Sequence, residues 1–410
     1  MREYWRNWAG DLSPGVRRFI ATESLFGIGA GILALILNLH LLELGMNEEQ
    51  IGQITSLGAI VTGLLSVPAG LLIRFVGRKA MLVIGMLLTG AGIAGFGLAT
   101  SPAAVAACQF VYSVGLTGIV TSEIQLIFEY CPDKKEERRA YALLFGMFTF
   151  FVGVGTLLGG VLPSWLGGYT TAYQYTFFAA AACYALGGGL RGLLLPPSGK
   201  APAAAAKVIP EQPSGRRAKY GPILVLCAVI FLSGVLFGLL NPYLNVIVKY
   251  RFGWHDEAIS ILLTLSGFFL FAGSLLVPSM LEKAGIRKSF VLLFAANALF
   301  AFLLALAVPA PVFSVLLLLR GGLFSMLSNL LDSEAMSAVR EEDRNLFAGW
   351  RTIARSAGNA LASYATGWIL AASDYRLPFL LAGIAFVLGY VLYLRTMEPI
   401  LVRREAARRT

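Results

Sequence analysis

The sequence predicts an all-α integral membrane protein with twelve transmembrane helices, arranged as two six-helix bundles with pseudo-two-fold symmetry. Three observations support this prediction, and composition is the first. Of 410 residues, 57% are hydrophobic and only 14% are charged. A soluble domain has about 25% charged residues. Because this chain has too few charges to cover a surface in contact with water, the bilayer must be its main solvent.

The second observation is a series of long apolar segments separated by short polar ones. A helix needs about 20 mostly apolar residues to cross about 30 Å of hydrocarbon. The predicted spans are residues 17–43, 48–73, 79–100, 102–128, 140–163, 169–195, 221–247, 256–281, 288–309, 311–334, 346–372 and 376–397. Proline-containing turns, SPAA at 101–104 and PAPV at 309–312, begin the fourth and tenth spans.

The third observation is the distribution of positive charge. Of the 33 Lys and Arg residues, 27 lie in one set of alternate loops and tails, three in the opposite loops and three inside spans. Cytoplasmic loops carry the excess of Lys and Arg, so both termini are predicted to be cytoplasmic in a multi-pass protein of the plasma membrane. The positive residues form short clusters between apolar runs, which argues against a nucleic-acid partner.

The middle of the chain reads as a linker between two halves. Residues 196–219 are rich in Pro, Ala and Lys and have no apolar period, which is typical of a flexible segment. We therefore expect an N-terminal six-helix bundle at 1–195, a cytoplasmic linker at 196–219 and a C-terminal six-helix bundle at 220–410.

The two halves also resemble each other in sequence. Gly45 corresponds to Gly253, and Gly77 corresponds to Gly285, both at an offset of 208 residues. Two parallel halves are a recognised plan of transporters, whose substrate sites lie near the middle of the membrane.

A short basic loop separates the second and third spans. Residues 70–79 read GLLIRFVGRK. With this loop, and with six spans, a linker and six more spans, the whole chain resembles the major facilitator superfamily. That family's loop signature runs Gly-x-Leu-x-Asp-Arg-x-Gly-Arg-Arg. The matching positions here are Gly70, Leu72, Gly77, Arg78 and Lys79.

Two positions depart from that signature, and at the second of them Phe75 replaces the base that follows the acid. Arg74 stands where the family has an acid, whereas the second half keeps the acid and the base as Glu282 and Lys283. The resemblance implies that this loop belongs to a charge network that holds the cytoplasmic side in one state. We expect the first-half network either to be rewired to an acid such as Glu129 or Glu136, or to be absent.

Ionisable residues inside spans are costly, so each is a candidate for function. Seven stand out: Glu23, Glu123, Arg320, Asp332, Glu334, Arg351 and Arg355. Four lie nearer the cytoplasmic ends, and for each of them the alternative is a purely structural ion-pair network: Glu123, Asp332, Glu334 and Arg351. Of these, Asp332, Glu334 and Arg351 are predicted to join the gate. Arg320 lies near mid-membrane with no adjacent acid, which favours a role in a cavity. Arg355 is either a second binding group or the partner of an acid.

Polar stripes add to this set. Gln109 and Glu123 share a face of the fourth span, and Asn241 and Asn245 share a face of the seventh. The resemblance implies that spans 1, 4, 7 and 10 line the central cavity. The predicted substrate-binding residues are Arg320, Asn241, Asn245, Gln109 and Arg355.

The energy source is predicted by elimination. The sequence has no phosphate-binding glycine loop followed by Lys and Ser or Thr, and no spacing of metal ligands, so no cofactor is expected. Transport would then use an ion or substrate gradient. A carboxylate in a low-dielectric site can exchange protons near neutral pH, so Glu23 and Glu123 are the predicted proton-coupling residues. His40 and His255 are expected to pack at the outer interface.

Glycines of the fifth span point to a direction of transport. Gly146, Gly155 and Gly159 match the start of the glycine-rich signature of proton-coupled drug exporters, although Gly160 replaces the expected proline. The predicted function is a secondary active transporter, working by alternating access, that exports a small amphipathic organic molecule. It would be a monomer, with that molecule and the lipid bilayer as its partners.

Two kinds of alternative remain open. One is transport of an organic anion or a lipid-like solute through Arg320 and Arg355. The other is a membrane-embedded enzyme or a non-transporting receptor, although the sequence shows no nucleophile constellation and no large extramembrane domain.

Overall fold

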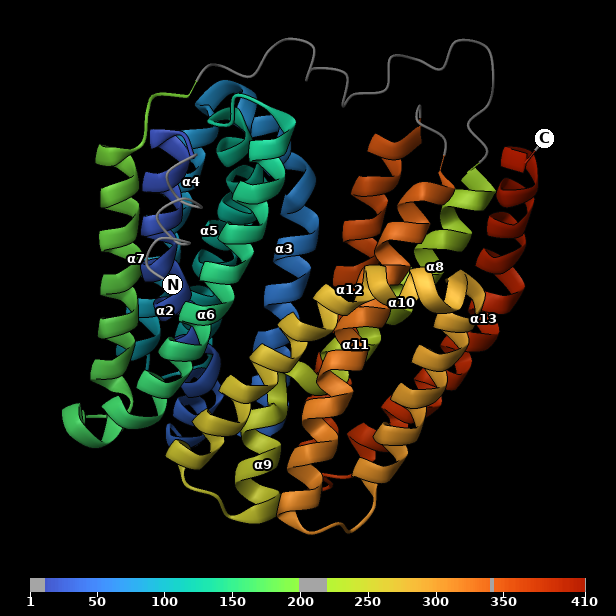
Figure 1. Ribbon diagram of the computed structural model, residues 1–410. Helices are drawn as coiled ribbons and strands as arrows, with labels where there is room; N and C mark the ends of the chain where they lie inside the picture. The colour runs from blue at the N-terminus through green and yellow to red at the C-terminus, as the bar shows by residue number, and fades with distance from the viewer. Residues whose placement is uncertain (1–11, 199–219, 340–342, 410) are drawn as a thin grey trace, which may run out of the picture. The chain divides into compact units, whose positions relative to one another are not determined.

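The computed structural model describes residues 12–198, 220–339 and 343–409. Within these ranges all regular structure is helical and there is no strand, which confirms the all-α prediction (Figure 1). The helices up to the linker are α2 (Pro14–Glu43), α3 (Glu48–Val76), α4 (Arg78–Leu98), α5 (Pro102–Glu129), α6 (Lys134–Leu166) and α7 (Gln174–Leu194). Those after it are α8 (Tyr220–Leu240), the 3₁₀ turn η2 (Asn241–Tyr243), α9 (Leu244–Phe252), α10 (Asp256–Ala305), α11 (Ala310–Ala338), α12 (Arg344–Ala371) and α13 (Leu377–Arg409).

Eleven segments of the described chain are long and apolar enough to cross a membrane. The predicted eleventh span, 346–372, corresponds to α12, which falls below that level of hydropathy and carries Arg351 and Arg355. The predicted linker lies mostly outside the described residues.

Contacts divide the chain into two compact units. The first comprises Met1–Gly45, Leu64–Ala203 and Asp256–Thr264, and the second comprises Met46–Gly63, Ala204–His255 and Leu265–Thr410. In the first unit, α2 packs against α6 and α7, and α4 packs against α5 and α7. In the second unit, α8 packs against α12 and α13. Residues 48–63, the first half of α3, are thus grouped with the second unit, whereas the rest of α3 is grouped with the first. Residues 256–264, the start of α10, are grouped with the first unit and the rest of α10 with the second.

Several helices begin where the sequence supplies a cap. The Ser13 hydroxyl accepts a hydrogen bond from the Val16 amide at 3.4 Å, and Pro14 follows at the first helical position of α2. Ser101 and Pro102 repeat this arrangement at α5, as expected from the SPAA turn. A side-chain oxygen satisfies an amide that has no partner in the first turn, and proline lacks that amide altogether.

Glycine makes the same reversal in both halves. Gly77 lies alone between α3 and α4 with φ 87° and ψ 153°. Gly285 interrupts α10 with φ 74° and ψ 165°, so the predicted eighth and ninth spans meet there without a longer loop (Figure 1). This backbone region is essentially restricted to glycine. The sequence correspondence of these two residues is therefore matched by their conformation.

The predicted seventh span, 221–247, is not one continuous helix. Pro242 lies in η2, between α8 and α9. Proline has no amide hydrogen and its ring clashes with the preceding turn, so the helix breaks. Hydroxyls of α12 donate to the carbonyls before the break: Thr366 Oγ1 to Leu239 O at 3.3 Å and Ser363 Oγ to Gly238 O at 3.4 Å.

Candidate functional site

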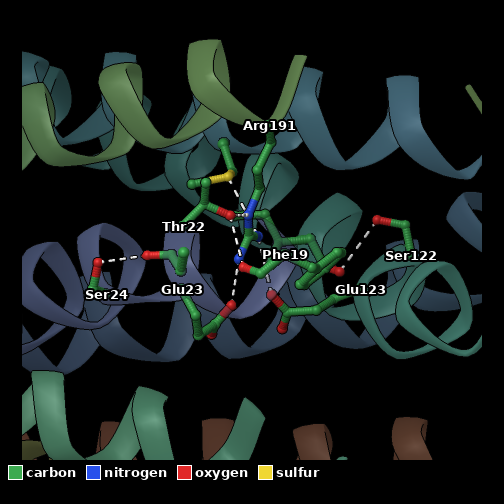
Figure 2. Close-up of polar contacts among 10 residues, drawn as sticks. Phe19, Thr22, Glu23, Ser24, Ser122, Glu123 and Arg191 are labelled. Atoms are coloured by element: carbon green, nitrogen blue, oxygen red, sulfur yellow. Dashed lines mark hydrogen bonds and ion pairs between the residues drawn. The ribbon is translucent and has the colours of Figure 1, made fainter. Parts of the chain in front are cut away.

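A buried arginine joins three helices of the first unit. Arg191, in the last turn of α7, has a side chain with no exposed surface. Its guanidinium donates to Glu23 Oε2 of α2 and, at 3.1 Å, to Glu123 Oε1 of α5. Figure 2 shows the two carboxylates converging on the same guanidinium. We call Glu23, Glu123 and Arg191 the carboxylate triad.

The remaining surface of the guanidinium is also satisfied. Its Nε donates to Thr22 Oγ1 at 3.1 Å, and Nη1 lies 3.5 Å from Met86 Sδ. The ring of Phe19 lies 4.6 Å from the guanidinium carbon, within the range of a cation–π contact. Arg191 is therefore held on its edges and on one face.

Small residues bring the three helices close enough for these contacts. A Cβ added at Gly29 of α2 would lie 2.7 Å from the Tyr184 ring of α7. A Cβ at Gly187 would lie 2.8 Å from the Met86 methyl carbon of α4. Because glycine lets helix backbones approach closely, α7 packs tightly against α2 and α4, and Arg191 reaches the acids on the neighbouring helices.

The triad contains more acid than base. With both carboxylates ionised it carries a net charge of −1, and with one of them protonated it is neutral. Glu23 has 1% of its side chain exposed and Glu123 has 15%. Two carboxylates that share a buried site resist simultaneous ionisation, so such a site can hold one exchangeable proton.

The structure thus brings together the two predicted proton-coupling residues, Glu23 and Glu123. Arg191 was missed, because the positive-inside count treats an arginine near the end of a span as a loop charge, and that assignment is wrong. The positions of the three residues relative to the ends of their helices could have indicated that they meet. Glu23 lies nine residues after the start of α2, Glu123 six before the end of α5, and Arg191 three before the end of α7. If these ends face the same side of the membrane, the three residues lie within about 9 Å of one another in depth, a difference that a long arginine side chain can bridge.

A second buried arginine lies in the second unit. Arg320 of α11 is 2% exposed. Within the described residues its Nε and Nη1 atoms have no hydrogen-bond partner. The ring of Phe324, one turn along α11, lies 5.8 Å from the guanidinium carbon. The predicted cavity residue is thus a buried cation that the described part of the protein does not neutralise.

Arg355, the other arginine predicted to bind substrate, has a protein partner. Its Nη2 lies 2.5 Å from Asp332 Oδ1, and Arg351 Nη1 lies 3.2 Å from the same oxygen. One carboxylate of α11 therefore holds two arginines of α12. Glu334 accepts a 3.4 Å hydrogen bond from Ser337 within α11. The structure thus brings together Asp332 and Arg351, two of the three residues predicted for the gate.

The predicted polar stripes are placed on three elements. Gln109 of α5 is buried, and its amide nitrogen donates to Ser113 Oγ at 3.2 Å. Its Oε1 atom has no partner in the described part of the chain. Asn241 lies half-buried in the η2 break, and Asn245 is buried in the first turn of α9. The helix break therefore separates the two asparagines that were expected to share one face.

The basic loop is bound to the first unit at several points. Arg78 Nη1 lies 2.8 Å from Glu129 Oε2 at the end of α5. Lys79 Nζ donates to the Leu195 carbonyl at 2.6 Å. Arg74 is half-buried in the last turn of α3, and the rewiring predicted for it stays a prediction. Glu136, the other acid considered as its partner, accepts a 2.6 Å hydrogen bond from the Ser13 amide.

Near this loop, Tyr130 follows α5 and donates its hydroxyl to the Pro196 carbonyl at 2.8 Å. Burial and the nearby Glu129 carboxylate raise the pKa of this hydroxyl, so it remains a donor at neutral pH. The start of the linker is thereby attached to the first unit.

The other residues predicted for the loop motif, in the first half and in its second-half counterpart, are more exposed to solvent. Glu282 and Lys283 are exposed and come just before the Gly285 break. Gly70 is exposed on α3, and a Cβ there would meet no atom within 4 Å. Gly70 therefore has no packing role in the described structure, and it lacks the positive φ that requires glycine at position 77.

Two of the exporter-type glycines have a packing role. A Cβ at Gly155 of α6 would collide with the Ile28 carbonyl of α2, and one at Gly159 would lie 3.3 Å from Ile32 Cα. Gly31 of α2 likewise approaches the Val152 backbone. These glycines allow α2 and α6 to pack closely, whereas a Cβ at Gly146 would meet nothing within 4 Å.

The histidines were predicted to pack at the outer interface. His40 is fully buried on α2, between Thr171 Oγ1 at 2.6 Å and the Phe96 carbonyl at 3.0 Å. The carbonyl can only accept, so Nε2 donates to it and Nδ1 accepts from the Thr171 hydroxyl. His255 is exposed just before α10. Among the residues described, no three His, Cys, Asp or Glu side chains form a group that could hold a metal ion.

In the described residues, eleven helical segments are long and apolar enough to cross a membrane, and ionisable side chains lie inside them, which is the architecture of a multi-pass membrane protein. The sequence pattern of the Major Facilitator Superfamily matches residues 20–223 and 226–409, and the chain belongs to that family.

Solved structures agree with this assignment at the level of the fold. A bacterial homologue of the iron transporter ferroportin has a TM-score of 0.74 at 16% identity, covering 93% of this chain and 98% of its own. A bacterial homologue of the human lysosomal transporter Spinster has a TM-score of 0.72 at 14% identity, covering 94% and 97%. The nucleoside transporter NupG has a TM-score of 0.68 at 15% identity, covering 93% and 98%.

Curated relatives match over shorter stretches. Monocarboxylate transporter 9 of Gallus gallus is 26% identical over 174 residues, which is 40% of this chain and 32% of that protein. The protein of the same name from Rattus norvegicus is 26% identical over 137 residues, 33% of this chain and 25% of its own. The match therefore spans a third or less of the length of these relatives.

Proposed function

We propose that this protein is a proton-coupled secondary transporter of a small organic solute, working by alternating access, with the carboxylate triad as its proton site. The observation that carries the proposal is the triad's composition, in which one buried guanidinium serves two carboxylates. Family membership supports transport. The relatives are named for monocarboxylates, nucleosides and iron, so their names do not agree on a substrate.

Coupling between proton binding and conformational change follows from the net charge of the carboxylate triad. In the protonated triad, Arg191 neutralises one carboxylate and the other carries the proton. Release of that proton leaves a net negative charge in a site closed to solvent on the Glu23 side, which is costly in a low-dielectric medium. A change of conformation that alters the exposure of Glu123 would therefore be linked to gain or loss of the proton. In this scheme Glu123, the more exposed acid, exchanges with water and Glu23 stays paired.

The proposal is tested in sealed proteoliposomes that contain a pH-sensitive dye. A panel of sugars, amino acids, organic acids and cationic drugs is added outside, and a substrate is recognised by the proton movement that it drives. We expect the wild type to move protons with one class of solute. Glu123→Gln should abolish that movement, while exchange of labelled for unlabelled solute continues.

The matched control is Glu129→Gln. Glu129 is an acid of the same helix, pairs with Arg78 and lies outside the triad. It should retain solute-driven proton movement. If Glu23→Gln and Glu123→Gln both leave that movement intact, the assignment of the proton site is wrong.

Export of an amphipathic molecule, the direction expected from the fifth span, now has less support. Gly155 and Gly159 are accounted for by the close packing of α6 against α2, so they need no further explanation. Transport measured in both orientations of the same vesicles would decide the direction.

A further inference from the structure

We propose that Arg320 anchors a binding site, in the second unit, for a small organic monoanion that has one carboxylate attached to an apolar body. The inference goes beyond the proposed function, because the carboxylate triad lies in the first unit and uses none of these residues. It begins from the two guanidinium nitrogens of Arg320 that have no partner among the described residues.

An unpaired arginine in this position needs an explanation. Arg320 is 2% exposed, and a guanidinium stays protonated in proteins. A buried charge without a counter-charge pays the desolvation penalty with no Coulombic return. The same chain shows the alternative, since Arg191 is just as buried and has two carboxylates, a hydroxyl and aromatic contacts.

The helix that carries Arg320 provides no acid at its level. Asp332 is the next acid along α11, twelve residues away, or about 18 Å along the axis at 1.5 Å per residue. Asp332 is itself occupied by Arg351 and Arg355. The anion that matches Arg320 is therefore expected to come from a bound molecule.

The surroundings indicate what that molecule looks like. Phe324 lies beside the guanidinium, and the Phe386 ring packs edge-on against Phe324 with centroids 6.3 Å apart. Gly321 and Gly322 follow Arg320 and pack against α10, where a Cβ at Gly322 would lie 3.0 Å from the Phe269 carbonyl oxygen. A guanidinium presents paired donors that fit one carboxylate, and the adjoining wall is aromatic. One cation balances one negative charge, so a dianion would leave a charge buried without a partner.

The experiment is a thermal-unfolding titration of the full chain in detergent, with benzoate as the probe and benzamide as its neutral match. A ligand that binds only the folded state raises the apparent melting temperature. Acetate tests for a carboxylate without an aromatic body, and inorganic phosphate tests for any small anion. The variants are Arg320→Gln and Arg320→Lys, with Arg251→Gln as the matched control, because Arg251 also lies beside an aromatic ring of the second unit, that of Phe313, but its guanidinium already donates to the Leu304 and Leu306 carbonyls.

We expect benzoate to raise the melting temperature of the wild type and of Arg251→Gln, each relative to its own ligand-free value, and benzamide to leave both unchanged. Arg320→Gln should weaken benzoate binding about tenfold or more while melting no lower than the wild type without ligand. Arg320→Lys should retain part of the benzoate response, because it keeps the charge and loses the paired donors.

Four outcomes would overturn the proposal. Benzamide could raise the melting temperature as much as benzoate does, which would show that the negative charge is not recognised. Inorganic phosphate could raise it as much as benzoate does, which would make the site a general anion site. Both benzoate and acetate could leave the melting temperature of the wild type unchanged. Finally, Arg320→Gln could melt well below the wild type without ligand, which would show that Arg320 already has a structural partner.

Discussion

The two buried arginines, one in each unit, differ in what surrounds them. Arg191 is saturated by two carboxylates, a threonine hydroxyl and an aromatic face. Arg320 is equally hidden, yet two of its nitrogens have no partner in the described chain. The difference teaches that burial of a charge does not by itself define a role. An excess of acid around an arginine suits a proton site, and a lack of acid suits a site for an external anion.

The largest effect should come from removing Arg191. Arg191→Gln leaves two carboxylates buried without a cation, and we expect the free energy of unfolding to fall by about 3–5 kcal/mol. Lowering the pH should recover part of this loss, because protonation neutralises the carboxylates. The measurement is unfolding in detergent at several pH values. Arg18→Gln is the control, because Arg18 is exposed on α2 and donates to the Leu194 carbonyl rather than to the triad. A variant as stable as the wild type would contradict the role given to the triad.

Replacing the corresponding glycine in either half should lower the free energy of unfolding by a similar amount, because the two glycines have the same backbone conformation. Gly77→Ala and Gly285→Ala each place a Cβ in a region of φ and ψ that is essentially restricted to glycine, at a cost of about 1–3 kcal/mol. Gly267→Ala, in the helical part of α10 with open space around it, should be neutral or slightly stabilising. A large loss at one of the two turns and none at the other would show that the repeat is not symmetric in energy.

Arg320 should respond in the opposite direction from Arg191. Arg320→Met removes a charge without stranding a partner, and we expect the ligand-free protein to gain roughly 1 kcal/mol. The same unfolding assay measures it. Loss of stability would place Arg320 in the same class as Arg191 and remove the contrast between them.

The smallest change in stability is expected at Glu123. Glu123→Gln leaves Arg191 paired one-to-one with Glu23, so the free energy of unfolding should stay within about 1 kcal/mol of the wild type. Proton movement should nevertheless be lost. A large loss of stability would mean that both carboxylates are structural and that neither is spare.

Much of the fold could be predicted from local signals. Apolar length, the proline turns and the glycine at each reversal all act within a few residues of the chain. Most helices begin and end within a few residues of the predicted positions, although α6 begins six residues earlier and α13 ends twelve residues later. The η2 break was missed, although Pro242 is a residue that predicts such a break. The apolar run over 221–247 was interpreted as one continuous helix in spite of this proline.

The site was harder to predict than the fold. Glu23 and Glu123 stood out because acids are rare in spans, but Arg191 did not, because an arginine near the end of a helix normally reaches water. Its burial depends on Gly29, Gly187 and Tyr184, which set how closely the helices pack. That distance is a tertiary property, and no spacing along one helix encodes it.

The break in the seventh span affects how the membrane topology of this chain can be established. The hydroxyls that α12 offers to the freed carbonyls, with its two arginines, contribute to a polarity that leaves α12 below the hydropathy of the other spans. A count based on hydropathy alone would stop at eleven and assign the two termini to opposite sides of the bilayer. A reporter fused to each end therefore provides a direct check: both signals on one side require α12 to cross.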